Sequence, residues 1–237
     1  MTPDSATESM SNPKGSCRPE SAPINFFRSI PIEVPLRMVL ARLGYRSSKT
    51  VLPGKQRERL EQTIAESFTL CEAQGCWLRL PIVEKRADAT VLAEGVVLQS
   101  ASLASLLKDS HAVVLMASTV GPEIVAAASE AMTCGDGATA VIHDAVGGQS
   151  ADAAMGWINE YVRRQLSRSA ERLTSQRYSP GYGDFSLEHQ SLFYSLLELE
   201  RLGLSLTSRF MLVPEKSVTA VAGIESARPL ETPYETP

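Results

Sequence analysis

Six consecutive apolar residues at positions 112–117 limit the possible folds of this chain more than any other segment. A strand with one face in water alternates polar and apolar residues, so an unbroken apolar run predicts a strand that is covered on both faces. A second strand is predicted at 217–224, where Val and Ala predominate. Separate helices and short strands occupy the rest of the sequence, and this mixture predicts one α+β domain. Two strand-to-helix units in the middle of the chain leave an α/β fold as the alternative.

Further elements are predicted from apolar periodicity and from the glycines and prolines that interrupt it. Leu60, Ile64 and Phe68 recur every four residues, which is typical of an amphipathic helix. Gly147-Gly148 predicts a turn between an apolar stretch at 138–145 and a helix that begins near position 150. The predicted helices are 32–45, 55–74, 102–110, 122–133, 150–174 and 187–202, and the other predicted strands are 76–83, 89–98, 204–206 and 210–213.

The two ends of the chain differ in composition from its middle. Residues 1–25 are rich in Ser, Pro and Glu, and residues 225–237 contain three prolines and few apolar side chains. Such segments cannot bury enough apolar surface to offset the entropy lost on ordering. We therefore expect a disordered tail at 1–25, a folded domain at 26–224 and a second disordered tail at 225–237.

Charge and hydropathy exclude several classes of protein. With 23 Lys and Arg against 27 Asp and Glu, the net charge is −4, which favours neither nucleic acid nor an anionic membrane as a partner. No run of about 18 apolar residues predicts a transmembrane helix, and the N-terminal stretch lacks the apolar centre of a secretory signal. The cysteines have no histidine near them, so we expect free thiols in the cytoplasm and no metal site; they are Cys17, Cys71, Cys76 and Cys134.

Residues 177–184, Arg-Tyr-Ser-Pro-Gly-Tyr-Gly-Asp, combine a fixed positive charge with aromatic rings and turn-forming residues. Pro180-Gly181 is a turn signal, because proline presets φ and glycine accepts a positive φ. Arg177 can bind a carboxylate through two parallel hydrogen bonds. The segment is therefore either a surface turn that carries an arginine or a loop that holds a small anionic or zwitterionic ligand.

Asp152, in the first turn of the helix predicted from position 150, also has two interpretations. The helix dipole stabilises a carboxylate there without any function, and the same carboxylate can pair with the ammonium or sulfonium group of a ligand. The sequence contains no Ser/His/Asp arrangement, no phosphate-binding loop and no G-x-G-x-x-G after a strand. A hydrolase or a dehydrogenase is therefore unsupported, and no catalytic residue is predicted.

Residues 177–182 resemble the Arg-Pro-Ala-Pro-Gly-Tyr signature of the activation (reactivation) domain of cobalamin-dependent methionine synthase. A Pro-x-x-Ser-Val segment follows about thirty residues later, at 214–218, and Asp144-Ala145-Val146-Gly147 matches the region upstream. The similarity covers roughly residues 30–224 and is greatest to the short stand-alone members of that family.

The resemblance implies a C-shaped α+β domain with a twisted antiparallel sheet and flanking helices. It implies binding of S-adenosylmethionine and docking onto a corrinoid methyltransferase module, either a separate enzyme or a split methionine synthase. The cobalamin would be carried by that partner, and flavodoxin or a similar protein would supply an electron. The chain would assist the reductive methylation of cob(II)alamin as part of a methyltransferase system, and we do not expect it to be a complete enzyme alone.

The resemblance also implies a set of site residues. Arg177 would hold the methionine carboxylate, the backbone around Ser179, Gly181 and Tyr182 would line the ligand, and Asp152 matches a family glutamate near the ligand. This chain has Ala222-Gly223 where the full-length enzyme has a Tyr-Phe pair against the ligand. That departure leaves an alternative: a non-catalytic module that docks on a corrinoid protein and has lost S-adenosylmethionine binding.

Overall fold

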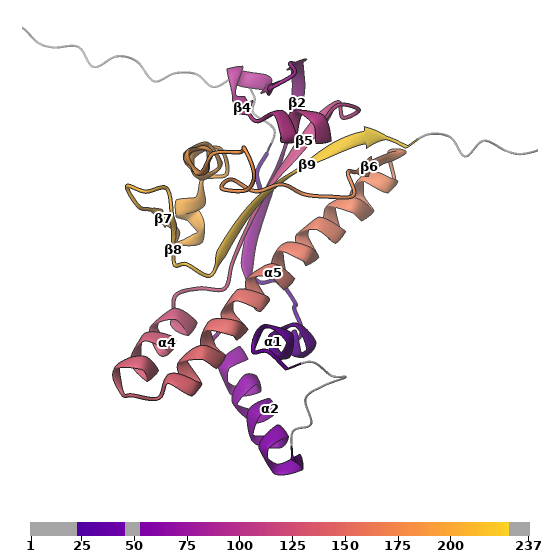
Figure 1. Cartoon of the computed structure of the whole chain (residues 1–237). Helices are drawn as coiled ribbons and strands as arrows, with labels where there is room; N and C mark the ends of the chain where they lie inside the picture. The colour runs from indigo at the N-terminus through magenta and orange to yellow at the C-terminus, as the bar shows by residue number, and fades with distance from the viewer. Residues whose placement is uncertain (1–22, 46–52, 228–237) are drawn as a thin grey trace, which may run out of the picture.

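The central strand of the fold is β5 (Ala112–Thr119), in a computed structural model that describes residues 23–45 and 53–227. It pairs antiparallel with β2 (Gln74–Lys85) on one side and with β9 (Ser217–Ser226) on the other (Figure 1). The other strands of this sheet are β1 (Asn25–Phe27), β3 (Ala89–Leu92), β4 (Val97–Gln99) and β6 (Glu171–Leu173). The strand order is β4-β3-β2-β5-β9-β6, and β1 also pairs with β2. Every pairing is antiparallel. This topology confirms the α+β class and excludes the α/β alternative.

Both faces of β5 are buried, as the apolar run predicts. All eight of its residues lie in the core. Val113, Leu115 and Ala117 belong to the core cluster that includes Phe185 and Phe193. The alternate residues, Ala112, Val114 and Met116, belong to the cluster under the long helix α5. The sheet is thus a middle layer with apolar residues on each side.

The helix α5 (Gly137–Ser167) packs on one face of the sheet, against β2, β5, β9 and β6 (Figure 1). The turn predicted at Gly147-Gly148 is wrong, because both glycines lie inside this continuous helix of 31 residues. The predicted helix end at 174 is also wrong. The helix ends at Ser167, and β6 follows and pairs with the end of β9.

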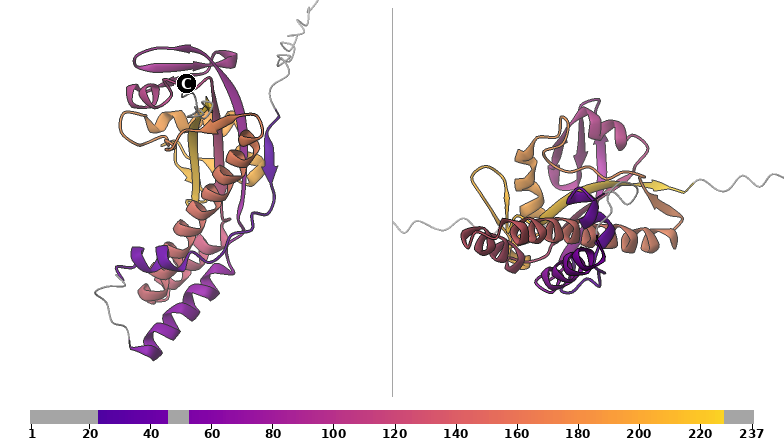
Figure 2. Two further views of the ribbon diagram at one scale, coloured as in Figure 1. Left: turned by 90° about the vertical axis from the view of Figure 1, so that its right-hand side faces the viewer. Right: turned by 60° about the horizontal axis from the view of Figure 1, so that its bottom comes forward.

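Three further helices lie at one end of α5, away from β3 and β4 (Figures 1 and 2): α1 (Leu36–Arg42), α2 (Gly54–Phe68) and α4 (Glu123–Thr133). Val39 of α1, Ile64 of α2 and Val146 of α5 share one small core there. Helix α2 is shorter than predicted, because β2 already begins at Gln74. Together with the twisted sheet, these helices give the molecule a curved, C-shaped outline, as expected (Figure 2).

The opposite face of the sheet carries short elements. The helix predicted at 187–202 is interrupted at Glu198, whose left-handed φ of 48° separates the 3-10 turn 199–202 from the helical residues before it. The predicted strand 89–98 likewise divides into β3 and β4 around a turn at Gly95. The short elements are η1 (Ala93–Gly95), α3 (Ala101–Leu106), η2 (Leu187–His189), α6 (Gln190–Leu196), η3 (Leu199–Leu202), and the hairpin of β7 (Ser205–Leu206) and β8 (Leu212–Val213).

Most of the two tails that we expect to be disordered, residues 1–22 and 228–237, lies outside the described residues.

Candidate functional site

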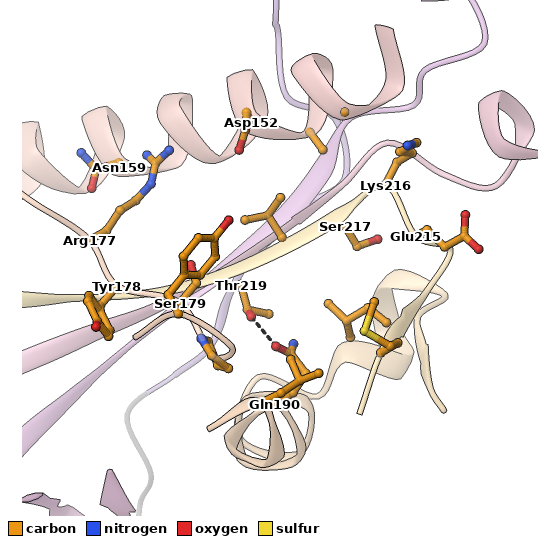
Figure 3. A pocket seen from close by; sticks show the side chains of 18 of the residues that line it. Asp152, Asn159, Arg177, Tyr178, Ser179, Gln190, Glu215, Lys216, Ser217 and Thr219 are labelled. Atoms are coloured by element: carbon orange, nitrogen blue, oxygen red, sulfur yellow. Dashed lines mark hydrogen bonds between the residues drawn. The ribbon is translucent and has the colours of Figure 1, made fainter. Parts of the chain in front are cut away.

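One edge of β9 opens into a cavity of about 960 Å³. Toward its C-terminal end this edge is covered, because β6 pairs with residues 224–226 and Tyr178 exchanges two backbone hydrogen bonds with Val221. At Ser217 and Thr219 the strand instead lines the cavity. The other walls are α5, the segment 174–182, the start of α6 and the segment 210–216 (Figure 3).

The segment that contains the Arg-x-x-Pro-Gly-Tyr sequence is held at both of its ends. At its start, Tyr178 is fixed to Val221 of β9. At its end, the carboxylate of Asp184 accepts hydrogen bonds from the Ser100 hydroxyl at 2.7 Å and from the backbone N–H groups of Ala101 and Ser102 at 2.7 and 3.1 Å. These donors at the beginning of α3 hold the pKa of Asp184 well below its usual range. The loop is therefore anchored to a helix N-terminus, a role that the sequence did not indicate.

Two glycines allow the tight path between these anchors. Gly181 has a φ of 91°, and its N–H donates to the carbonyl of Phe185 at 2.7 Å. Gly183 has a φ of 55°, and a Cβ there would collide with the Tyr178 hydroxyl. The loop thus needs glycine for both backbone conformation and close packing.

Four of the five predicted site residues line this one cavity. Arg177, Ser179 and Tyr182 come from the loop, and Asp152 comes from α5. Gly181 is not among the lining residues, although its neighbours Pro180 and Tyr182 are. Tyr182 stands at the rim, with 69% of its surface exposed. That these residues bind S-adenosylmethionine stays a prediction.

Arg177 and Asp152 present opposite charges to the cavity. Across the described residues, 23–45 and 53–227, neither side chain has a hydrogen bond or an ion pair within the protein. Figure 3 shows Arg177 extending toward α5 beside Asn159, with Asp152 further along the same helix. An unpaired guanidinium and an unpaired carboxylate on one cavity suit a zwitterionic ligand.

The sequence reasoning missed several lining residues, and two polar ones matter most here. Asn159 lies seven residues after Asp152, which places it on the same face of α5, and this spacing was a usable signal. Gln190 begins α6 and is buried, and its hydrogen-bond partner, Thr219, lies 29 residues away in sequence. No local pattern indicates such a long-range pair.

A cluster of charges links the cavity to the helical end of the molecule. Lys216, in the cavity wall, donates a short hydrogen bond to Asp144 of α5, and Arg42 of α1 lies 3.5 Å from the other oxygen of the same carboxylate. Partial burial acts to raise the pKa of Asp144, but the two cations outweigh it and hold the pKa below its usual range. Lys216 is therefore neutralised by a partner within the protein, whereas Arg177 is not.

Gly147 makes room for the Lys216 side chain of this cluster. A Cβ at Gly147 would lie 3.0 Å from Cγ of Lys216 and 3.2 Å from Ile124, and a Cβ at Gly148 would touch the Arg42 guanidinium at 3.9 Å. Gly147 therefore serves the close approach of Lys216 and Ile124, whereas a Cβ at Gly148 would make only ordinary contact with Arg42.

Ala222 and Gly223, where the resemblance implies an aromatic pair in the full-length enzyme, do not line the cavity. Both are buried in the strand, and a Cβ on Gly223 would clash with Ser110 and crowd Leu107 and Thr174. The space beside this part of β9 is occupied by side chains of the protein, so no aromatic wall is available for a ligand there.

The described part of the chain contains no group of three His, Cys, Asp or Glu residues arranged to hold a metal ion. It also contains no helix that is both long enough and apolar enough to span a membrane. The cavity is lined by charged and polar side chains that can bind and orient a small ligand.

No protein-family model matches the sequence, and no curated protein matches it. Among solved structures, the chain is similar to the crystal structure of the MetH reactivation domain bound to AdoHcy, with a TM-score of 0.63 and 15% sequence identity. The superposition covers 92% of this chain and 82% of that one. The chain therefore has the fold of the MetH reactivation domain.

Proposed function

We propose that this chain binds S-adenosylmethionine in the cavity beside β9. The observation that carries the proposal is that Arg177 and Asp152 lie on the walls of one cavity and have no partner within residues 23–45 and 53–227. The fold supports it, because the similar MetH reactivation domain was crystallised with AdoHcy. Both compounds carry an α-amino acid group, whose carboxylate and ammonium match the two charges.

Each residue of the proposed site has a separate task. Arg177 binds the carboxylate through its planar guanidinium, and Asp152 attracts the positive charge of the ammonium or sulfonium group. Ser179 and Tyr182 border the ligand from the loop, and Asn159 borders it from α5. S-adenosylmethionine supplies a methyl group to an acceptor when it is bound. The contribution of the chain is to bind and orient this donor.

We further propose that the acceptor is a corrinoid carried by a separate methyltransferase or by a split methionine synthase. The chain then assists reductive methylation of cob(II)alamin, and flavodoxin or a similar protein provides the electron. A cytoplasmic location fits this role, and the free thiols of Cys71, Cys76 and Cys134 are compatible with a reducing compartment.

A second function is favoured by one specific observation. The positions of the aromatic pair, Ala222 and Gly223, offer no wall to a ligand in this chain. The chain is then a docking module that recognises the corrinoid protein without binding S-adenosylmethionine.

A methyl-transfer assay separates the two functions. The chain is mixed with a purified cobalamin-binding fragment of methionine synthase in the cob(II)alamin state, a low-potential chemical reductant and S-adenosylmethionine labelled in its methyl group. We expect label on the corrinoid only when the chain is present, and less label with Arg177→Ala. Co-elution of the chain with the corrinoid fragment without any transfer of label would instead establish the docking function.

A further inference from the structure

The side-chain amide of Gln190 is only half satisfied. Gln190 is 4% exposed, and its Oε1 accepts a hydrogen bond from the Thr219 hydroxyl at 2.9 Å. Its Nε2 is buried and has no hydrogen-bond partner within residues 23–45 and 53–227. Both residues line the cavity, and Figure 3 shows Gln190 pointing from α6 to Thr219 of β9. A buried polar group without a partner is costly, so its retention at a cavity wall points to a ligand that supplies the partner.

This conclusion does not depend on how the amide is turned. The Thr219 hydroxyl can donate to the oxygen or accept from the nitrogen, so either orientation uses one polar atom of Gln190 and leaves the other. Gln190 therefore has one free hydrogen-bonding atom at the cavity wall in both cases.

The position of Gln190 along β9 places it near the predicted loop. The backbone of Tyr178 bonds to Val221, and the side chain of Gln190 bonds to Thr219, two residues earlier on the same strand. Two residues of a strand span about 7 Å. One ligand of moderate length can therefore contact both the loop that carries Arg177 and the amide of Gln190.

The edge of β9 adds main-chain groups at this point. The N–H and C=O of Val221 point away from β5, toward Tyr178, and those of Gly223 point the same way, toward Thr174. The direction of the N–H and C=O groups alternates from one residue of a strand to the next. Those of Thr219, two residues before Val221, therefore also point away from β5 toward the open edge. A donor and an acceptor of the main chain thus lie beside the Gln190 amide.

We propose that Gln190 and the Thr219 edge of β9 form the subsite for the base of a nucleoside ligand, with adenine as the base. Adenine carries ring nitrogens that accept hydrogen bonds next to an amino group that donates them, and this matches the mixed donors and acceptors at Thr219 and Gln190. The inference rests on the proposed binding of S-adenosylmethionine. It assigns the nucleoside half of that ligand, whereas Arg177 and Asp152 are assigned the amino-acid half.

The test uses 5′-methylthioadenosine, which keeps the nucleoside but has no carboxylate, together with S-adenosylhomocysteine. Gln190→Leu is expected to weaken the binding of both compounds about tenfold, the loss of one hydrogen bond to a buried group. Arg177→Ala is expected to weaken the binding of S-adenosylhomocysteine far more than the binding of 5′-methylthioadenosine. The matched control is Gln62→Leu, the same substitution at an exposed position on α2, outside the cavity lining.

Gln190→Glu provides a second variant, because it keeps the shape of the side chain and replaces the free donor with a carboxylate oxygen. Thermal unfolding checks that each variant is folded. Gln190→Leu removes the unsatisfied Nε2 but also the acceptor of the buried Thr219 hydroxyl, so a moderate fall in its melting temperature is expected. Wild-type affinity for 5′-methylthioadenosine in both variants would overturn the base subsite and leave S-adenosylmethionine binding standing. If the wild-type protein binds neither compound, the proposed function fails and the subsite fails with it.

Discussion

Arg177 and Lys216 are two cations on the same cavity, and their partners distinguish their roles. Lys216 is neutralised by Asp144, and its side chain is 14% exposed, so its charge is used inside the protein. Arg177 is exposed and has no such partner among the described residues. Of the two, Arg177 is the charge that remains for a ligand.

Arg177→Ala should therefore reduce binding without reducing stability. Hydrogen bonds to a charged group contribute about 1.5–3 kcal/mol, so we expect the affinity for S-adenosylhomocysteine to fall by roughly tenfold to a hundredfold. The melting temperature should change little, because Arg177 has no hydrogen bond or ion pair with the described residues. Calorimetric titration and thermal unfolding of the same sample measure both quantities. Arg177→Lys is the matched control, since it keeps the charge but loses the two parallel hydrogen bonds.

Asp184 should make the anchored loop sensitive to acid. Its pKa in the folded protein is lowered by hydrogen bonds from Ser100, Ser102 and Ala101, so its contribution to stability is present above the unfolded-state pKa, near ~3.9. That contribution is lost as the pH falls through the lower pKa of the folded protein. We expect Asp184→Asn to be less stable than wild type at pH 7, and the difference in melting temperature to shrink below about pH 4. A difference that is constant from pH 7 to pH 3 would show that the charge of Asp184 plays no part.

At the scale of elements, helix α5 connects the two parts of the molecule. It covers the sheet, carries Asp152 and Asn159 into the cavity wall, and supports α1, α2 and α4 at its other end. Its Gly147 admits the side chain of Lys216, which meets Arg42 at Asp144. The helix thus holds the cavity wall and the helical end together.

Two substitutions in α5 should have opposite effects on stability. A methyl group added at Gly156 would have no neighbour within 4 Å, so Gly156→Ala should stabilise the protein by about 1 kcal/mol through helix propensity. Gly147→Ala makes the same gain but crowds Ile124 and the stem of Lys216, and overpacking of this kind costs about 1–3 kcal/mol. We expect the melting temperature to rise for Gly156→Ala and to fall for Gly147→Ala. A rise for both would contradict the close approach of Lys216 to α5.

The elements also show which parts of the fold could be predicted. The strand at 112–117 was predicted correctly because burial on both faces leaves a direct mark on the sequence. The turn at Gly147-Gly148 was predicted wrongly because a glycine that serves packing looks the same in sequence as a glycine that serves a turn. Gln190 was missed because its role comes from a contact with Thr219 that only the folded sheet creates. Local pattern thus predicted the layers of the fold, and long-range contacts determined the details of the cavity.

At the scale of the whole molecule, the curled sheet leaves one stretch of β9 open between α5 and α6. The short β6 covers only residues 224–226, and the anchored loop covers Val221, so the edge at Thr219 is left for the cavity. The ligand would contact α5, β9, α6 and the loop together, and it would bind only the folded chain. Ligand at a hundredfold excess over its dissociation constant should therefore stabilise the protein by about 2.7 kcal/mol, measured as a rise in melting temperature.

The central claim is that the isolated chain binds S-adenosylmethionine through Arg177, and titration calorimetry tests it most directly. Wild-type protein is titrated with S-adenosylmethionine and with S-adenosylhomocysteine, and Arg177→Ala is titrated in parallel. We predict saturable one-to-one binding in the micromolar range for wild type and much weaker binding for the variant. The absence of heat up to millimolar ligand, or equal affinity in the variant, would contradict the claim.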